Sequence, residues 1–271
     1  MVALLSPLNS SEINQLYVFG DSLSDVGNVF RATGRQYPAS PPYFQGRFAN
    51  GPVWVEYLAD ALALNSERNT NFACGGATTG SGSINGIPGL LAQVNNFTKT
   101  HQRANPHALY VLWAGANDYL YGAASTLTPV ENLSKAIESL AKVGAKRILV
   151  ANLPDLGQLP ASRETGNSQK LSSITSAHNL GLAESVDLLQ KKLVSDTQLH
   201  IFDVNALYRE AIANPGKFGF TNVTDRCLNN LTRCEHPNQF LFWDGIHPTT
   251  AGHRLLALYA ENTAVSKAIA A

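Results

Sequence analysis

Short apolar segments alternate with helix-like segments about five times along this chain, and this order limits the possible folds more than any other feature. The clearest apolar segment, HALYVLWAG at 107–115, reads as one continuous run. Such a run is typical of a strand buried on both faces of a parallel sheet. We predict further strands over 15–19, 70–74, 199–205 and the first part of 146–157.

The segments between these strands carry helix signals. Pro129 near the start, Gly144 at the end and an apolar stripe between them predict a helix over 129–144. Another pattern begins at Asn50, which we expect to be the N-cap of a helix with Pro52 in its first turn. Further helices are predicted over 90–103, over about 169–195, and from Pro248 to about Ala260.

Repeated strand–helix units predict an α/β fold, a three-layer αβα sandwich around a mainly parallel central sheet of about five strands. The 271 residues would suit one large domain or two small ones. We expect a single domain over 1–271, with 1–14 as a peripheral N-terminal segment. In such sheets, ligands bind at the carboxyl ends of the strands, so the residues that follow each strand are the first candidates for a site.

Charge and hydropathy exclude several classes of partner. Lys plus Arg equals Asp plus Glu, 20 of each, so a broad positive surface for nucleic acid is not expected. No stretch approaches the ~20 apolar residues that cross a bilayer. The first residues, MVALLSPLNSSEINQ, lack the basic region of a secretion signal, and we predict no signal peptide here.

The chain contains three cysteines. Cys227 and Cys234 lie close together in a loop-like region and could form a small disulfide, which would favour a compartment outside the reducing cytosol. The alternative is a pair of free thiols. A zinc site with His236 does not match the common ligand spacings, so we predict no metal. Cys74 follows an apolar run and is expected to be a small buried hydrophobe.

Polar residues or glycines follow three of the predicted strands, and further polar residues occur in a loop near the C-terminus. They are Asp21 and Ser22, Gly75 and Gly76, Asn117 and Asp118, and Asp244 with His247. The first three pairs share one rim of a parallel sheet, and the fourth joins them if the last helix packs back on the sheet. Each motif alone has a plain explanation as a turn or a helix boundary. Their occurrence together favours a catalytic site.

These residue types form a hydrolytic set. A serine hydroxyl such as that of Ser22 needs a base to take its proton, and histidine is the base whose ordinary pKa is near neutrality. Asp244 and His247 are three residues apart, so the carboxylate can orient the imidazole locally. The Ser22 N–H, the Gly76 N–H and the Asn117 amide could stabilise an oxyanion, with Gly75 as the alternative to Gly76.

Other assignments fit less well. The nucleophile elbow of α/β-hydrolases is Gly-x-Ser-x-Gly, whereas Gly20-Asp21-Ser22-Leu23-Ser24 lacks the last glycine. The glycine-rich segment 75–89 could cradle a phosphate, but it has no Gly-x-Gly-x-x-Gly fingerprint. A non-catalytic ligand-binding module of the same fold is a further alternative.

The motifs FGDSLSDVGN, NFACGGATTG, GANDYL and FWDGIHPTTAGH resemble those of the GDSL-type, or SGNH, serine hydrolases. The resemblance extends over most of the chain and is strongest to the bacterial branch of secreted lipases and lecithinase-like thermolabile haemolysins. It implies the flavodoxin-like fold of that family, Ser22 as nucleophile, and His247 and Asp244 as base and orienting residue. Ser22, Gly76 and Asn117 would form the oxyanion hole.

The resemblance further implies a cofactor-free esterase or lipase acting on carboxylic esters of short to medium acyl chains, including glyceride or phospholipid esters. Sugar acetates and thioesters are the alternatives. We expect Asp21, Tyr119 and Phe48 to contact substrate. Contact with lipid aggregates is also expected, and exported members of the branch favour a secreted or periplasmic location. Oligomeric state is not predicted.

Overall fold

The computed structural model describes residues 13–65, 67, 69–122, 125–193 and 196–265. Its centre is a parallel sheet of five strands in the order β2-β1-β5-β6-β7. The strands are β1 (Gln15–Gly20), β2 (Asn69–Asn71), β5 (Ala108–Trp113), β6 (Arg147–Ala151) and β7 (Gln198–Phe202). Of the predicted peripheral segment 1–14, residues 1–12 lie outside the described part of the chain.

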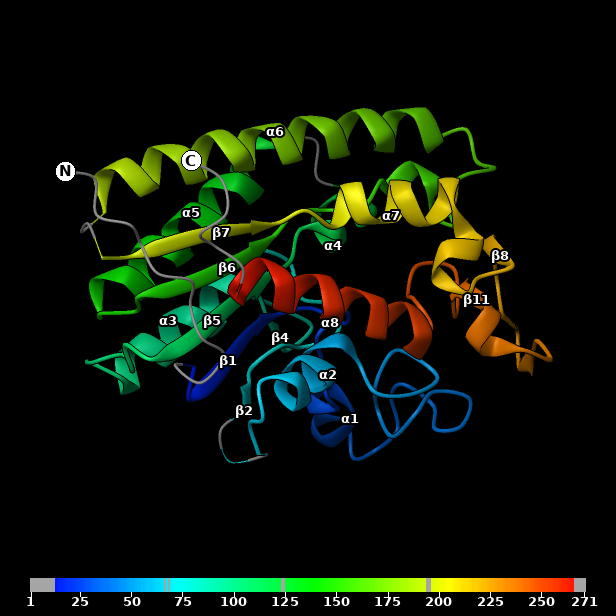
Figure 1. The fold of residues 1–271 in the computed structure, drawn as a ribbon, viewed down its shortest axis with the longest axis horizontal. Coiled ribbons are helices and arrows are strands. Elements are labelled where there is room, and N and C mark those ends of the chain that lie inside the picture. The colour runs from blue at the N-terminus through cyan, green and yellow to red at the C-terminus, as the bar shows by residue number, and fades with distance from the viewer. Residues whose placement is uncertain (1–12, 66, 68, 123–124, 194–195, 266–271) are drawn as a thin grey trace.

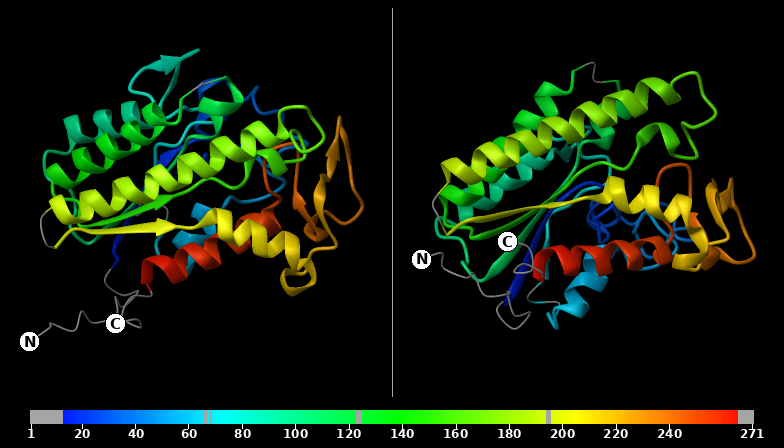
Figure 2. Two further views of the ribbon diagram at one scale, coloured as in Figure 1. Left: turned by 90° about the horizontal axis from the view of Figure 1, so that it is seen from above. Right: turned by 45° about the horizontal axis from the view of Figure 1, so that its top comes forward.

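Helices cover both faces of this sheet (Figures 1 and 2). One face packs against α3 (Leu90–Thr100), α5 (Leu127–Lys142) and α6 (Ser168–Lys192). The other packs against α2 (Trp54–Ala61), α7 (Val204–Ala213) and α8 (Thr250–Val265). The predicted αβα sandwich with a parallel five-stranded sheet is therefore confirmed.

The alternation of side chains along β1 explains the two cores. Leu16 and Val18 point into the core under α2 and α8, whereas Tyr17 and Phe19 point into the core under α3, α5 and α6. All six residues of β5 are buried. This central position is why the 107–115 segment has no polar face.

The order in which strands are added to the sheet reverses at β1. The chain passes from β1 to β2 on one side, and then from β5 through β6 to β7 on the other. Gly20 at the end of β1 pairs with Trp113 at the end of β5. In doubly wound sheets the crevice at such a switch point is where ligands bind. The segments that follow these two strands leave the sheet side by side.

Smaller elements lie at the carboxyl rim and the periphery. They are α1 (Asn28–Ala32), β3 (Ser83–Ile84), β4 (Ile87–Pro88), α4 (Ala116–Leu120), η3 (Leu156–Gln158), η4 (Pro215–Phe218), β8 (Asn222–Arg226), β9 (Leu228–Asn229), β10 (Thr232–Arg233), η5 (Pro237–Gln239) and β11 (Phe240–Phe242). A disulfide joins Cys227 to Cys234. Among the described residues, no helix is long and apolar enough to cross a bilayer.

Two local predictions need correction. Asn50 does not cap α2, which begins at Trp54 after an N-cap at Val53. The Asn50 side chain instead accepts a hydrogen bond from the Thr250 N–H, 2.8 Å away, at the start of α8. Pro52 accordingly lies before α2 and not in its first turn. Tertiary packing has assigned this capping residue to a helix 200 residues away.

The second correction concerns β2. It ends at Asn71 and not at Cys74, and the Asn71 side chain accepts from the Ala73 N–H beyond its end. The Cys74 N–H nevertheless donates to the Gly20 carbonyl. The glycine pair that follows therefore starts directly beside the end of β1.

Candidate active site

A tight turn at the end of β1 presents Ser22. One carboxylate oxygen of Asp21 accepts from the Leu23 N–H at 3.0 Å, and the Asp21 carbonyl accepts from the Ser24 N–H at 3.1 Å. Gly20 has no room for a side chain, since a Cβ there would lie 2.4 Å from the Trp113 carbonyl oxygen. The close pairing of β1 with β5 thus requires glycine immediately before this turn.

The loop between β11 and α8 is organised by Asp244. Its Oδ1 accepts from the backbone N–H groups of Ile246, at 2.9 Å, and His247, at 2.8 Å. Its Oδ2 lies 2.8 Å from His247 Nδ1. The carboxylate therefore fixes both the backbone of the turn and the orientation of the imidazole, as the three-residue spacing predicts.

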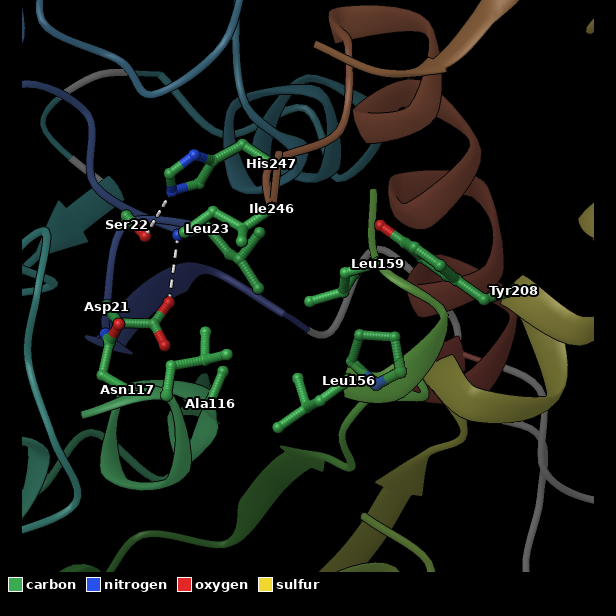
Figure 3. Close-up of a pocket in the computed structure, with 12 residues that line it drawn as sticks. Asp21, Ser22, Leu23, Ala116, Asn117, Leu156, Leu159, Tyr208, Ile246 and His247 are labelled. Carbon is green, nitrogen blue, oxygen red and sulfur yellow. Dashed lines mark hydrogen bonds between the residues drawn. The ribbon is translucent and has the colours of Figure 1, made fainter. Parts of the chain in front are cut away.

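The two segments meet at the carboxyl rim of the sheet. His247 Nε2 lies 2.8 Å from the Ser22 Oγ, although 225 residues separate them (Figure 3). Both residues are 7% exposed. A continuous chain of hydrogen bonds thus runs from the Ser22 hydroxyl through the imidazole to a buried carboxylate. This is the geometry in which a histidine can remove a serine proton.

The environment of Asp244 keeps its carboxylate ionised. Burial alone would raise its pKa, but the positive charge of His247 and hydrogen bonds from His247, the Ile246 N–H and Tyr43 outweigh burial and lower the pKa to about 2. The Tyr43 hydroxyl donates to Asp244 Oδ2 at 2.7 Å. An ionised carboxylate next to His247 stabilises the imidazolium that forms when the serine proton is transferred.

The two glycines after β2 differ in whether their N–H groups are already hydrogen-bonded. The Gly75 N–H donates to the buried carboxylate of Asp25 at 2.8 Å, so it is already used. Gly76 has a φ of +85°, a left-handed conformation that favours glycine, and its N–H donates to no group within the described part of the chain. Of the two, Gly76 is therefore the better candidate donor to an oxyanion.

Asn117 follows β5 at the start of α4 and lines the same pocket as Ser22. Its Nδ2 donates one hydrogen bond to the Ala77 carbonyl at 2.9 Å. A side-chain amide carries two N–H bonds, so a second donor remains for a substrate oxygen. The bond to Ala77 also ties Asn117 to the loop that carries Gly76.

The pocket beside Ser22 is small and largely apolar, with a volume of about 20 Å³. Figure 3 shows Asp21, Ser22, Asn117 and His247 on one side of it. The remaining wall consists of Leu23, Ala116, Leu120, Pro154, Leu156, Leu159, Tyr208 and Ile246. Burial raises the pKa of the Asp21 carboxyl to about 7. Asp21 lies in the pocket as expected of a substrate contact.

Tyr119 and Phe48 are placed differently from that expectation. Tyr119 is buried in the core, where its hydroxyl lies 2.8 Å from His178 Nδ1, and its neighbour Leu120 lines the pocket. Phe48 is also buried, with its ring 5.3 Å from the His247 ring. Its ring therefore packs against the imidazole.

The other cysteine and buried histidine side chains are not arranged for catalysis. Cys74 is half-buried, and burial raises the pKa of its thiol to about 11. Burial lowers the pKa of His178 to about 4, and burial together with the charge of His247 lowers that of His253 to about 3. The sulfurs of Cys227 and Cys234 are bonded to each other and are not thiolate ligands.

Comparison with known proteins agrees with this geometry. Residues 16–260 match the family described as GDSL-like lipase/acylhydrolase. The chain belongs to this family. The resemblance inferred from the sequence motifs is therefore confirmed, and the match covers the five strands of the central sheet except for Gln15, the first residue of β1.

Among relatives of the GDSL family, the chain is 31% identical over 223 residues to a phosphatidylcholine-sterol acyltransferase of Aeromonas hydrophila, covering 79% of this chain and 65% of that protein. It is 29% identical over 273 residues to a thermolabile hemolysin of Vibrio parahaemolyticus, covering 92% and 63%. With the secreted effector protein SseJ of Salmonella typhimurium the identity is 31% over 272 residues, covering 94% and 64%. The chain spans less than two thirds of the length of each.

Solved structures of similar fold include the M. smegmatis aryl esterase, with a TM-score of 0.55 at 17% identity, covering 92% of this chain and 97% of that one. A carbohydrate acetylesterase from Sinorhizobium meliloti gives a TM-score of 0.54 at 14% identity, covering 92% and 97%. These similarities show the shared fold.

Sequence reasoning did not find two features of this GDSL site. The hydrogen bond from Tyr43 to Asp244 joins residues 201 positions apart, and no local pattern in the sequence relates the two. Gln93 of α3 accepts from the Gly20 N–H and donates to its carbonyl, each at 2.9 Å, which fixes the end of β1. A glutamine on the otherwise apolar buried face of α3 was the available signal.

Proposed function

We propose that this protein is a carboxylic ester hydrolase that forms an acyl-enzyme on Ser22. The observation that carries the proposal is the chain of 2.8 Å contacts from Ser22 Oγ to His247 Nε2 and from His247 Nδ1 to Asp244. It lies beside a pocket that also holds Asn117. We further propose that 1–271 form one hydrolase domain.

In the first step, Ser22 Oγ attacks the ester carbonyl carbon while His247 Nε2 accepts the hydroxyl proton. The carbonyl π electrons move to the oxygen. The Ser22 N–H, the Gly76 N–H and the second N–H of Asn117 donate to that oxyanion. The Asp244 carboxylate stabilises the imidazolium.

The tetrahedral intermediate then collapses. The bond from carbon to the alcohol oxygen breaks, and the imidazolium of His247 gives its proton to that oxygen. The acyl group stays on Ser22. A water molecule next attacks the acyl-enzyme, with His247 again accepting and returning the proton, and the second collapse releases the acid and the free Ser22 hydroxyl.

The proposed substrates are esters of short to medium acyl chains, including glyceride or phospholipid esters. Support comes from the apolar wall of the pocket and from the relative named phosphatidylcholine-sterol acyltransferase. Carbohydrate acetates and thioesters are the alternative for the same machinery, and the fold shared with a carbohydrate acetylesterase is compatible with the first of these.

We also propose contact with lipid aggregates beside the site. Tyr37 is 58% exposed and its ring lies 5.6 Å from that of Phe48, which in turn packs against His247. Tyr121, at the end of the helix that carries Asn117, is 71% exposed. Tyrosines of this kind suit the boundary between water and lipid.

The test is labelling with a fluorophosphonate, which reacts with an activated serine. The wild-type protein should be labelled and should hydrolyse p-nitrophenyl butyrate, and Ser22→Ala should abolish both. Ser24→Ala is the matched control, because its hydroxyl lies in the same turn but accepts from the Trp54 indole N–H at 3.0 Å. Failure to label the wild type would favour a non-catalytic ligand-binding module.

A further inference from the structure

A second and larger cavity lies behind the pocket that contains Ser22. Its volume is about 200 Å³. It is lined by Asp155, Gln158, Leu159, Asn205, Tyr208, Arg209, Ile212, Ala213 and Phe242. We call it the Ile212 cavity. Two of these residues, Leu159 and Tyr208, also line the pocket at Ser22. Their side chains are therefore the wall between the two spaces.

The pocket at Ser22 is too small for an ester chain. Its volume of about 20 Å³ is about a tenth of that of the Ile212 cavity. Anything larger than a very small group on the carbonyl carbon must leave this pocket. Figure 3 shows Leu159 and Tyr208 on the side of the pocket away from Ser22, so a chain that leaves in this direction meets the wall first.

The wall between the two spaces is made of two side chains, those of Leu159 and Tyr208, and substitution can shorten either one. Leu159 directly follows η3 and is 3% exposed. Tyr208 comes from α7 and is also buried, with its ring 6.0 Å from that of Phe242 on the far side. The wall is thus formed by one side chain from the loop after β6 and one from α7. The leucine is the smaller of the two side chains.

The lining of the Ile212 cavity combines an apolar part with the polar side chains of Asp155, Asn205, Gln158 and Arg209. Leu159, Tyr208, Ile212 and Phe242 supply hydrocarbon surface. Gln158 and Arg209 are exposed at its edge. A saturated chain could bury its methylene groups inside while its end reaches that edge. Apolar surface of this kind favours each buried methylene.

The position of His247 indicates whether the acyl side or the alcohol side of the ester faces the Ile212 cavity. The leaving alcohol oxygen must lie against His247 Nε2 to receive a proton. The aromatic cluster of Tyr43 and Phe48 lies beside His247 and lines neither of the two cavities. An alcohol placed against His247 leaves the direction of Leu159 for the acyl group.

From these observations, and resting on the proposed ester hydrolysis, we propose that the Ile212 cavity binds the acyl chain of the substrate. Leu159 and Tyr208 form the wall that determines which chain lengths are accepted. A medium chain enters by displacing the Leu159 side chain, whereas an acetyl group stays within the pocket at Ser22.

The test compares kcat/KM for p-nitrophenyl octanoate with that for p-nitrophenyl acetate. Removing the wall with Leu159→Ala should raise the octanoate-to-acetate ratio by at least about tenfold, the discrimination that one methylene gives in an apolar pocket. Filling the cavity with Ile212→Trp should lower the ratio by about tenfold. The double variant should lose the gain of Leu159→Ala.

Leu156→Ala is the matched control, because Leu156 lines the pocket at Ser22 but not the Ile212 cavity. An equal gain in that control, or an unchanged ratio in both Leu159→Ala and Ile212→Trp, would overturn the proposal. So would a gain that appears with octyl acetate and not with p-nitrophenyl octanoate, since the chain would then be the alcohol.

A binding measurement separates this inference from the proposed function. Octanoate should bind the Ser22→Ala variant, and adding Ile212→Trp should weaken its affinity about tenfold. Weakened binding in a protein whose wild type hydrolyses no ester would refute the proposed function alone. Normal hydrolysis with affinity unaffected by Ile212→Trp would refute the inference alone.

Discussion

Replacing Asn117 by alanine gives the most direct test of the proposed oxyanion hole. The Asn117 amide has one N–H bonded to the Ala77 carbonyl at 2.9 Å, and the other is left for the substrate. The change therefore removes one transition-state donor and also leaves a buried carbonyl without that partner. The two losses should appear in different measurements.

The magnitudes follow from these two roles. Loss of one oxyanion donor should lower kcat by about 10²–10³-fold, which corresponds to about 2.7–4 kcal/mol. KM should change little, since the donor acts mainly on the charge that develops in the transition state. Leaving the Ala77 carbonyl unpaired should lower the free energy of unfolding by about 1–3 kcal/mol. In a chain of this size each kcal/mol lowers Tm by about 2–4 °C.

The assay is steady-state hydrolysis of p-nitrophenyl butyrate together with thermal unfolding of the same samples. Asn152→Ala is the matched control: Asn152 is buried at the end of β6, donates to Asp203 at 2.8 Å and accepts from the Asn205 N–H at 3.0 Å. It should lose similar stability and keep kcat. A kcat for Asn117→Ala within a few-fold of wild type, or a loss confined to KM, would refute the assignment of Asn117 as a donor.

Three further outcomes are expected. Tyr43→Phe removes the hydrogen bond to the Asp244 carboxylate and should lower the free energy of unfolding at pH 7 by about 1.5–3 kcal/mol in urea denaturation, with an unchanged midpoint contradicting that bond. Burial raises the pKa of Asp21 to about 7 in the folded state. Between the ordinary pKa of an aspartate and pH 7, the folded state therefore keeps a proton that the unfolded state loses. The free energy of unfolding should then fall with rising pH by up to about 1.4 kcal/mol per pH unit. Urea titrations of Asp21→Asn should lack this component, and an identical pH dependence would contradict it. Replacing Cys227 and Cys234 by serine opens a loop of sequence separation 7 and should lower the free energy of unfolding by about 2–3 kcal/mol, measured by calorimetry against the oxidised wild type; an unchanged Tm would contradict this contribution.

The order of strands and helices could be predicted because it depends on local patterns. The 107–115 run indicates a doubly buried strand, and β5 is buried along its whole length. Boundaries were less accurate where side chains from elsewhere decide them. Asn50 has a capping side chain, but the orphan N–H that it satisfies belongs to α8 and not to the helix that follows it in the sequence.

The residue types at the candidate site could also be named from the sequence. Asp244 and His247 contact each other across three residues, so their spacing carries the information. Ser22 and His247 were grouped because each occurs where a strand end or a rim loop is expected. Their 2.8 Å separation requires that β1 and α8 pack on the same sheet. The direction of Tyr119 could not be read, since one turn of helix decides whether a side chain faces the pocket or His178.

The sequence by itself determined the α/β alternation, the family and the set of polar residues at the strand ends. Periodicity and turn chemistry depend on neighbours within a few positions, so they can be recognised from the sequence directly. Only the tertiary structure decided that the Gly75 N–H is used by Asp25 while that of Gly76 is left, that Tyr43 supports Asp244, and that Leu159 divides two cavities. Which hydrogen-bond donors and acceptors remain unused, and which apolar side chains line a cavity, depends on how distant segments pack together.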